Sequence, residues 1–113
     1  MSQFASRTTG NGVTVVRPEG RVNMVVAPAL RKELHRLVDE GNTRVVVDLS
    51  GTDFIDSSGL GAVISGLKAA RQAGGDLRIA APTRQVVTVL ELTNLDRVLR
   101  AYDSADEAFD GAT

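Results

Sequence analysis

Cysteine is absent from this chain of 113 residues, and histidine occurs once, at His35. The missing thiols exclude a disulfide framework and a thiolate metal site, and one imidazole cannot form a histidine cluster. Neither charge sign dominates, because 13 basic residues stand against 14 acidic ones. We therefore expect no direct binding to nucleic acid or to an anionic membrane surface. We also expect no cofactor and no metal.

Long apolar runs are missing as well. No window reaches the length that a bilayer span needs, and the N-terminal stretch MSQFASRTTGNG lacks the apolar centre of a secretory signal. We therefore expect a cytoplasmic protein whose partner is another protein. The chain length and the 42% hydrophobic content predict a single domain over residues 1–113, with a core from about 12 to 109.

The hydrophobic pattern alternates between strands and helices. Polar residues and glycines up to Gly12 suggest a loose N-terminus, and VTVVRPEGRVN then predicts two short strands paired as a hairpin. Further strands are expected at 43–49, 77–81 and 98–102, and helices from Pro28 to before Gly41, from the DSSG segment to before Gly74, and at 86–92. The S-x-x-E capping box of Ser104 and Glu107 predicts a last short helix through Phe109.

Two apolar stripes identify the faces of the first two helices that pack on a sheet. They consist of Leu30, Leu34, Leu37 and Val38 in the first helix and Leu60, Val63, Ile64 and Leu67 in the second. The whole pattern predicts an α/β fold with a mixed central sheet of four to five strands and about four helices packed mainly on one face.

The segment DFIDSSGLG, which starts at Asp53, places two hydroxyls and two carboxylates where a buried strand becomes a helix. Such a junction has spare backbone N–H groups and the positive end of a helix dipole. Since Gly59 and Gly61 lack side chains, a phosphate on Ser57 could approach the amides of the first turn. It would add about −1.5 to −2 charge beside Asp53 and Asp56 and so repel a docked partner. A plain helix N-cap at Asp56 or Ser57 fits the same pattern.

The junction lies within the stretch VVVDLSGTDFIDSSGLGAVISGLKAARQAGGDLRIAAP, which is followed by a second stretch, VVTVLELTNLDRVLRAYDSADEAF. Together they resemble the STAS domain of bacterial anti-sigma factor antagonists, from about Gly12 to Phe109. The resemblance implies that Ser57, directly after the aspartate, is phosphorylated. It also implies two partners, an anti-sigma factor with serine kinase activity and a phosphatase that restores the serine. The unmodified protein would bind the kinase and release a sigma factor, and phosphorylation would end the complex.

The partner surface is expected around the phosphorylated serine. It comprises Asn23, Met24, Val25, Asp53, Asp56, Ser58, Gly59 and Leu60. The family commonly reads G-E-L-D where this chain has Gly20-Arg21-Val22-Asn23, so Asn23 retains hydrogen bonding but lacks the acidic charge. It either alters the choice of partner or simply holds a turn. The apolar run 24–26 either faces solvent as a contact for a partner or packs under the helix. We expect a monomer or a weak dimer.

Enzyme alternatives lack their motifs. A serine hydrolase elbow needs glycine two positions before the nucleophile, where Ser57 has Ile55 and Ser58 has Asp56. His35 lies in a helical ELHRL stretch and is expected to be structural, and no glycine loop for a nucleotide is present. We therefore expect no enzyme. The remaining alternative is a STAS binding or scaffold subunit of a sensory or lipid-transport assembly without sigma factor control.

Overall fold

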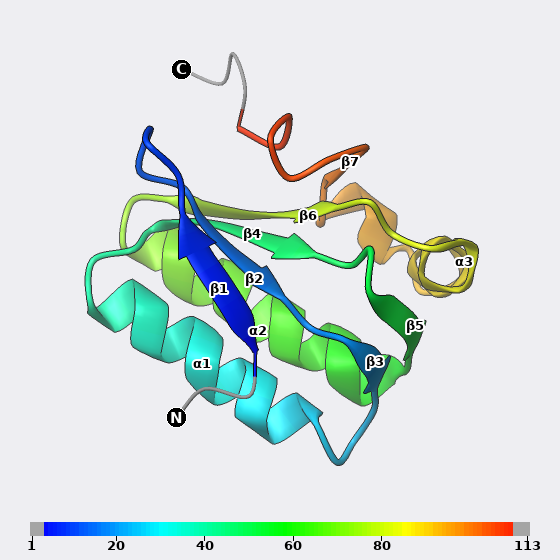
Figure 1. Cartoon of the computed structure of the whole chain (residues 1–113). Helices are drawn as coiled ribbons and strands as arrows, with labels where there is room; N and C mark the ends of the chain where they lie inside the picture. Colours follow the sequence, from blue (N-terminus) through cyan, green and yellow to red (C-terminus); the bar gives the residue numbers. More distant parts are fainter. Residues whose placement is uncertain (1–3, 110–113) are drawn as a thin grey trace.

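The computed structural model describes residues 4–109, and its centre is a five-stranded mixed sheet (Figure 1). In spatial order the strands are β1 (Ala5–Thr8), β2 (Thr14–Arg17), β4 (Arg44–Asp48), β6 (Asp76–Ala80) and β7 (Ala101–Tyr102). β1 is antiparallel to β2, whereas the other neighbours are parallel. A separate parallel pair, β3 (Gly20–Val22) and β5 (Thr52–Ile55), lies beyond the ends of β2 and β4 (Figure 1).

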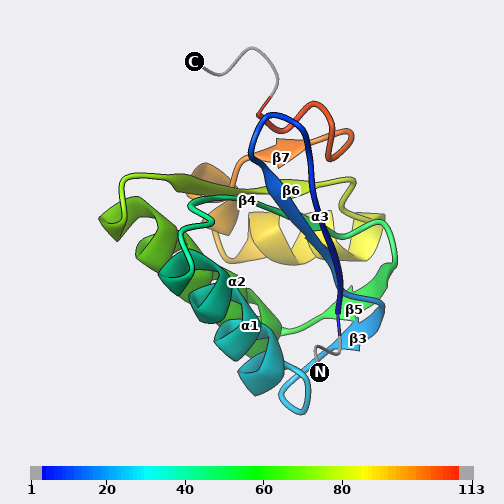
Figure 2. The ribbon, with the colours of Figure 1, turned by 60° about the vertical axis from the view of Figure 1, so that its left-hand side comes forward.

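Two long helices cover one face of the five-stranded sheet. They are α1 (Ala27–Asp39) and α2 (Ser57–Gln72), which lie side by side in Figures 1 and 2. The third helix, α3 (Arg84–Leu92), packs beside β5 and is followed by a 3-10 turn at Leu95–Arg97. The expected α/β fold, with a mixed sheet and helices mainly on one face, is confirmed.

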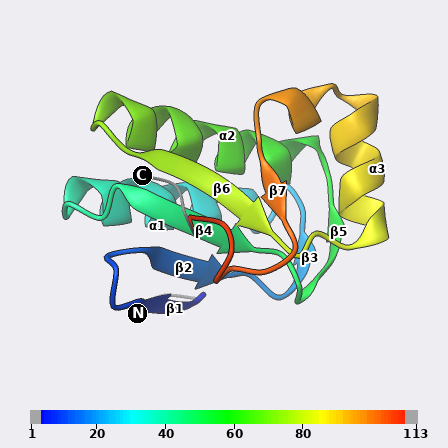
Figure 3. The ribbon, with the colours of Figure 1, turned by 90° about the horizontal axis from the view of Figure 1, so that it is seen from above.

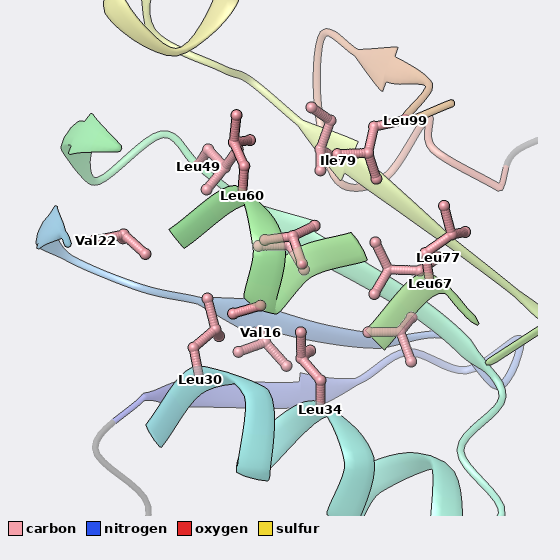
Figure 4. Packing of buried hydrophobic residues seen from close by; sticks show 14 of the residues in the cluster. Val16, Val22, Leu30, Leu34, Leu49, Leu60, Leu67, Leu77, Ile79 and Leu99 are labelled. Atoms are coloured by element: carbon pink, nitrogen blue, oxygen red, sulfur yellow. The ribbon is translucent and has the colours of Figure 1, made fainter. Parts of the chain in front are cut away.

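The core between the helices and the sheet is built by the two predicted stripes (Figure 4). Of the eight predicted side chains, seven are buried and Ile64 is half-buried. Burial of each leucine or valine contributes roughly 1.5–3 kcal/mol. Gly66 lets the two helices approach closely, because a Cβ at this position would lie 2.7 Å from Cδ1 of Leu34.

The predicted hairpin around Pro18 is wrong. β2 and β3 do not pair with each other: Val15 is opposite Val46 in a parallel pair, and Val22 is opposite Ile55 in the second sheet. Instead, the break between them carries the chain from one sheet to the other. Oγ1 of Thr52 donates a hydrogen bond of 3.1 Å to the Pro18 carbonyl, which fixes the break against the start of β5.

Both ends of the described chain also differ from expectation. The N-terminal segment is not loose, because β1 pairs along its length with β2; its four side chains are exposed, so they leave no alternating pattern to detect. No helix forms after Ser104, where residues 105–109 make turns. Oγ of Ser104 does accept a 3.3 Å hydrogen bond from the Glu107 N–H, but one such bond does not propagate a helix.

The C-terminal turns lie on the sheet face opposite α1 and α2 (Figures 1 and 3). Phe109 and Ala108 are buried against a second apolar cluster that includes Val46. The guanidinium of Arg78 lies 4.2 Å from the centroid of the Phe109 ring, and its Nη1 donates a 2.8 Å hydrogen bond to the Ala108 carbonyl. The segment therefore acts as the second covering layer of the sheet.

Candidate functional site

The site begins where β5 becomes α2. Asp56 is the N-cap of α2 in extended conformation, and its Oδ1 accepts a 2.9 Å hydrogen bond from the Gly59 N–H. Its carbonyl accepts the first helical bond from Leu60, at 3.0 Å. Of the two N-cap positions considered from the sequence, the structure selects Asp56. Ser57 is therefore the first helical residue.

Both serines of the junction are exposed. No hydrogen bond ties the Ser57 hydroxyl to any other residue in the described range 4–109. An exposed and unengaged hydroxyl at the N-terminal end of a helix is accessible to a modifying enzyme, and the helix dipole favours negative charge there. The geometry is therefore compatible with a phosphate on this side chain.

The role expected for Gly59 needs correction. This residue is buried, and a Cβ on it would lie 2.3 Å from the Val22 carbonyl oxygen and 2.8 Å from Cγ1 of Ile55. Its N–H is already bonded to Asp56. Gly59 is thus required by the close approach of α2 to β3, not by access of a phosphate. Gly61, in contrast, is exposed, with no atom within 4 Å of a Cβ built on it.

The loop after β3 forms the second part of the site. Oδ1 of Asn23 accepts hydrogen bonds from the N–H groups of Val25 and Val26, at 3.0 and 3.3 Å. Its side-chain oxygen therefore holds the turn that leads into α1. The apolar run beside it faces solvent, since Met24 is 69% and Val25 is 81% exposed. Val26 is half-buried and packs against the core.

The two parts are brought together by the β3–β5 pair. Val22 is opposite Ile55, so Asn23 and Asp56 directly follow neighbouring parallel strands. The Asp56 N–H donates a 3.3 Å hydrogen bond to the Val22 carbonyl across this end. Met24 and Ser58 consequently line the same groove.

The remaining predicted site residues divide into exposed and buried ones. Asp53 is exposed on β5 and Asp56 is half-buried by its capping bond. Gly59 and Leu60 were expected in the partner surface but are buried, so they support the first turn from below. The exposed part of the predicted surface therefore consists of Met24, Val25, Asp53 and Ser58, and it adjoins the exposed Ser57.

His35 takes no part in this junction. Its Nε2 lies 2.7 Å from Oγ of Ser65, in the middle of the contact between α1 and α2. Within residues 4–109, no group of three or more histidine, aspartate or glutamate side chains is placed to hold a metal ion. No helix in the same range is long and apolar enough to cross a membrane.

Comparison with known proteins identifies the family. Residues 5–108 match the family model described as the STAS domain. A protein of Thermotoga maritima, a candidate anti-sigma factor antagonist, is 31% identical over 99 residues, which cover 87% of this chain and 88% of that protein. The chain belongs to the STAS family of anti-sigma factor antagonists.

Solved STAS structures agree with this fold. The crystal structure of a candidate anti-sigma factor antagonist from Thermotoga maritima superposes with a TM-score of 0.88 at 29% identity, covering 96% of this chain and 92% of that one. The Bacillus cell fate determinant SpoIIAA in its phosphorylated form has a TM-score of 0.74 at 19% identity, with coverage of 97% and 99%. At that identity the second likeness concerns the fold alone.

Sequence reasoning missed one side chain that shapes this STAS site. Gln85 of α3 lies beside the end of β5, where its Oε1 accepts from the Ile55 N–H at 2.9 Å and its Nε2 donates to the Ile55 carbonyl at 3.1 Å. The side-chain amide thus bonds as a neighbouring strand would. No local pattern signals this contact, because the two residues are 30 positions apart in the sequence.

Proposed function

We propose that this chain is an anti-sigma factor antagonist whose activity is switched by phosphorylation of Ser57. The unmodified protein binds an anti-sigma factor with serine kinase activity and thereby releases a sigma factor. The kinase then phosphorylates Ser57 and the complex dissociates. A phosphatase later restores the hydroxyl, and the protein can bind the kinase again. The chain is the substrate and antagonist of the kinase and supplies no catalytic residue. A single domain over 1–113, a cytoplasmic location and a monomer or weak dimer belong to the same proposal.

The observation that carries the proposal is the exposed, unengaged hydroxyl of Ser57 beside an exposed apolar loop. Met24 and Val25 offer a partner apolar area that is worth roughly 25 cal/mol per Å² when it is buried. A phosphate on Ser57 would place about −1.5 to −2 charge at the edge of that contact. Docking would then require the new charge to lose its hydration, next to the carboxylates of Asp53 and Asp56.

Folding should tolerate the same modification. Ser57 is the first residue of α2, where the helix dipole stabilises negative charge by roughly 0.3–1 kcal/mol. Its side chain makes no hydrogen bond that a phosphate would break within the described chain. Phosphorylation is thus expected to change the binding surface and leave the fold intact, as a reversible switch requires.

The test is a phosphorylation assay with matched serine variants. The protein is incubated with each anti-sigma factor kinase encoded in the same genome and with radiolabelled ATP. We expect label on the wild type and on Ser58→Ala, but not on Ser57→Ala. Both serines are exposed neighbours, so Ser58→Ala controls for general damage to the junction. Label that persists on Ser57→Ala would refute the assignment.

Binding of the kinase by Ser57→Asp is the second measurement. We expect at least a tenfold loss of affinity, while the free energy of unfolding stays within roughly 0.5 kcal/mol of the wild type, as for other surface substitutions. Calorimetric titration and denaturant unfolding measure the two quantities separately. A variant that binds normally, or one that loses binding because it unfolds, would contradict the mechanism.

A further inference from the structure

A groove runs between α1 and α2 on the solvent side of the helix pair. Its volume is about 830 Å³. The residues of its end nearest the phosphorylation site are Met24, Pro28, Arg31, Lys32, Ser58 and Gly61. We call this surface the α1–α2 groove. His35 and the basic residues of α1 also line this groove. The proposed phosphorylation switch does not use them.

Small side chains produce the groove. Gly61 presents no side chain, and a Cβ built on it would meet no atom within 4 Å. Ala27, Pro28 and Ala62 line the groove beside it, so this part of the lining is apolar. Met24 forms the outer edge with 69% of its surface exposed. Such a lining can take the apolar side chains of a helix laid along it.

The basic side chains along the groove differ in whether a carboxylate is paired with them. Arg36 is paired with Glu33 at 2.8 Å and with Glu40 at 2.9 Å, and the hydrogen bonds to these carboxylates raise the pKa of Arg36. Arg31 and Lys32 are exposed, and within residues 4–109 no carboxylate lies within 4.0 Å of either. The half of the groove beside Ser58 is therefore basic and uncompensated.

Arg31 is also held in place. Its Nε donates a 3.0 Å hydrogen bond to Oγ of Ser65, the same oxygen that His35 contacts at 2.7 Å. The hydrogen bond anchors the guanidinium on α2 and leaves its terminal nitrogens available. A positioned guanidinium is suited to a carboxylate, because the two groups can form parallel hydrogen bonds.

We infer that the α1–α2 groove is the docking site for an acidic amphipathic helix of the anti-sigma factor kinase, with carboxylates on Arg31 and Lys32 and apolar side chains over Met24 and Pro28. This inference rests on the proposed function, since the kinase is the occupant. Ser58 lines the groove, so a helix seated there lies beside the hydroxyl of Ser57. The phosphate added to Ser57 would then repel the same carboxylates that the two basic residues attract.

Charge reversal tests the inference. The kinase that labels Ser57 is titrated with the wild type, with Arg31→Glu/Lys32→Glu, and with the control Arg97→Glu/Arg100→Glu. The control residues are exposed near the 3-10 turn and change the net charge equally. At 0.1 M salt we expect roughly tenfold weaker binding for the groove variant only, mainly through slower association. The difference should shrink at 1 M salt, where the screening length is about 3 Å.

Further variants separate the possible failures. Lys32→Glu alone leaves the Ser65 hydrogen bond intact, so weaker binding by it shows that the loss is electrostatic and not a disturbance of α1. A photo-crosslinker at Lys32 should capture a kinase peptide that is helical and acidic. Capture of a basic peptide, or wild-type affinity of the groove variants while Ser57 is still labelled, would refute the docking site in the α1–α2 groove. Either result would leave the phosphorylation of Ser57 standing. If no kinase labels Ser57, both proposals fall.

Discussion

The close approach of α2 to β3 gives a quantitative prediction for Gly59→Ala. The new Cβ would lie 2.3 Å from the Val22 carbonyl oxygen and within 2.9 Å of Val22 Cγ1. The carbonyl cannot move freely, because it accepts a hydrogen bond from the Asp56 N–H. Overpacking of this kind costs up to about 3 kcal/mol. Alanine gains about 1 kcal/mol over glycine in a helix, so we expect a net loss of about 2 kcal/mol.

Gly61→Ala is the matched control, two residues further along the same helix. Space around it is open, so only the gain from helix propensity, about 0.5–1 kcal/mol, should remain. Thermal unfolding followed by circular dichroism measures both variants. The midpoint temperature of Gly59→Ala should fall by about 10 °C. If it proves as stable as Gly61→Ala, the first turn of α2 does not rest on the Val22 carbonyl and the account of the junction is wrong.

Two other regions give predictions of stability. Leu60→Ala should lower the free energy of unfolding by about 2–5 kcal/mol, because the side chain lies in the core and is only 2% exposed. Ile64→Ala should lower it by less, since Ile64 is only half-buried. Equal losses in denaturant unfolding would contradict this ranking. Arg78→Ala removes the hydrogen-bond donor to the Ala108 carbonyl and one of the two guanidinium groups over the Phe109 ring, the other being that of Arg44. We expect faster amide exchange in residues 103–109, with a loss of local stability of about 1–3 kcal/mol. Unchanged exchange there would show that Arg78 does not hold the segment.

The helices and the central strands could be predicted from their apolar patterns. The leucine stripe of α1 shows which side of the helix is buried, and the unbroken valine run of β4 indicates a strand that is buried on both faces. The hairpin failed for a different reason. Local pairing is the simplest arrangement for two short adjacent strands, but β2 and β3 belong to different sheets. β2 pairs locally with β1 instead, and the parallel partners of β2 and β3 are β4 and β5, about 30 residues away. No local pattern contains that information.

The site could be located from the sequence but not fully explained. Asp56 and Ser57 were correctly placed at a helix start, since capping preferences are local. The reason for Gly59 required coordinates, because the obstructing carbonyl comes from Val22, far away in the chain. Asn23 could be interpreted either as a partner contact or as a turn residue. Only the hydrogen bonds from Val25 and Val26 show that its oxygen is engaged inside the loop.

The amide of Gln85 has a consequence for how other molecules can approach. A bare strand edge attracts foreign strands, and proteins usually protect such edges with charge or proline. Here one neutral side chain occupies both backbone hydrogen-bonding groups of Ile55, two residues before Ser57. A strand of another polypeptide therefore cannot form backbone hydrogen bonds with Ile55 on this edge of β5. Edge-to-edge association through the small sheet is thereby discouraged without adding a charge beside Ser57.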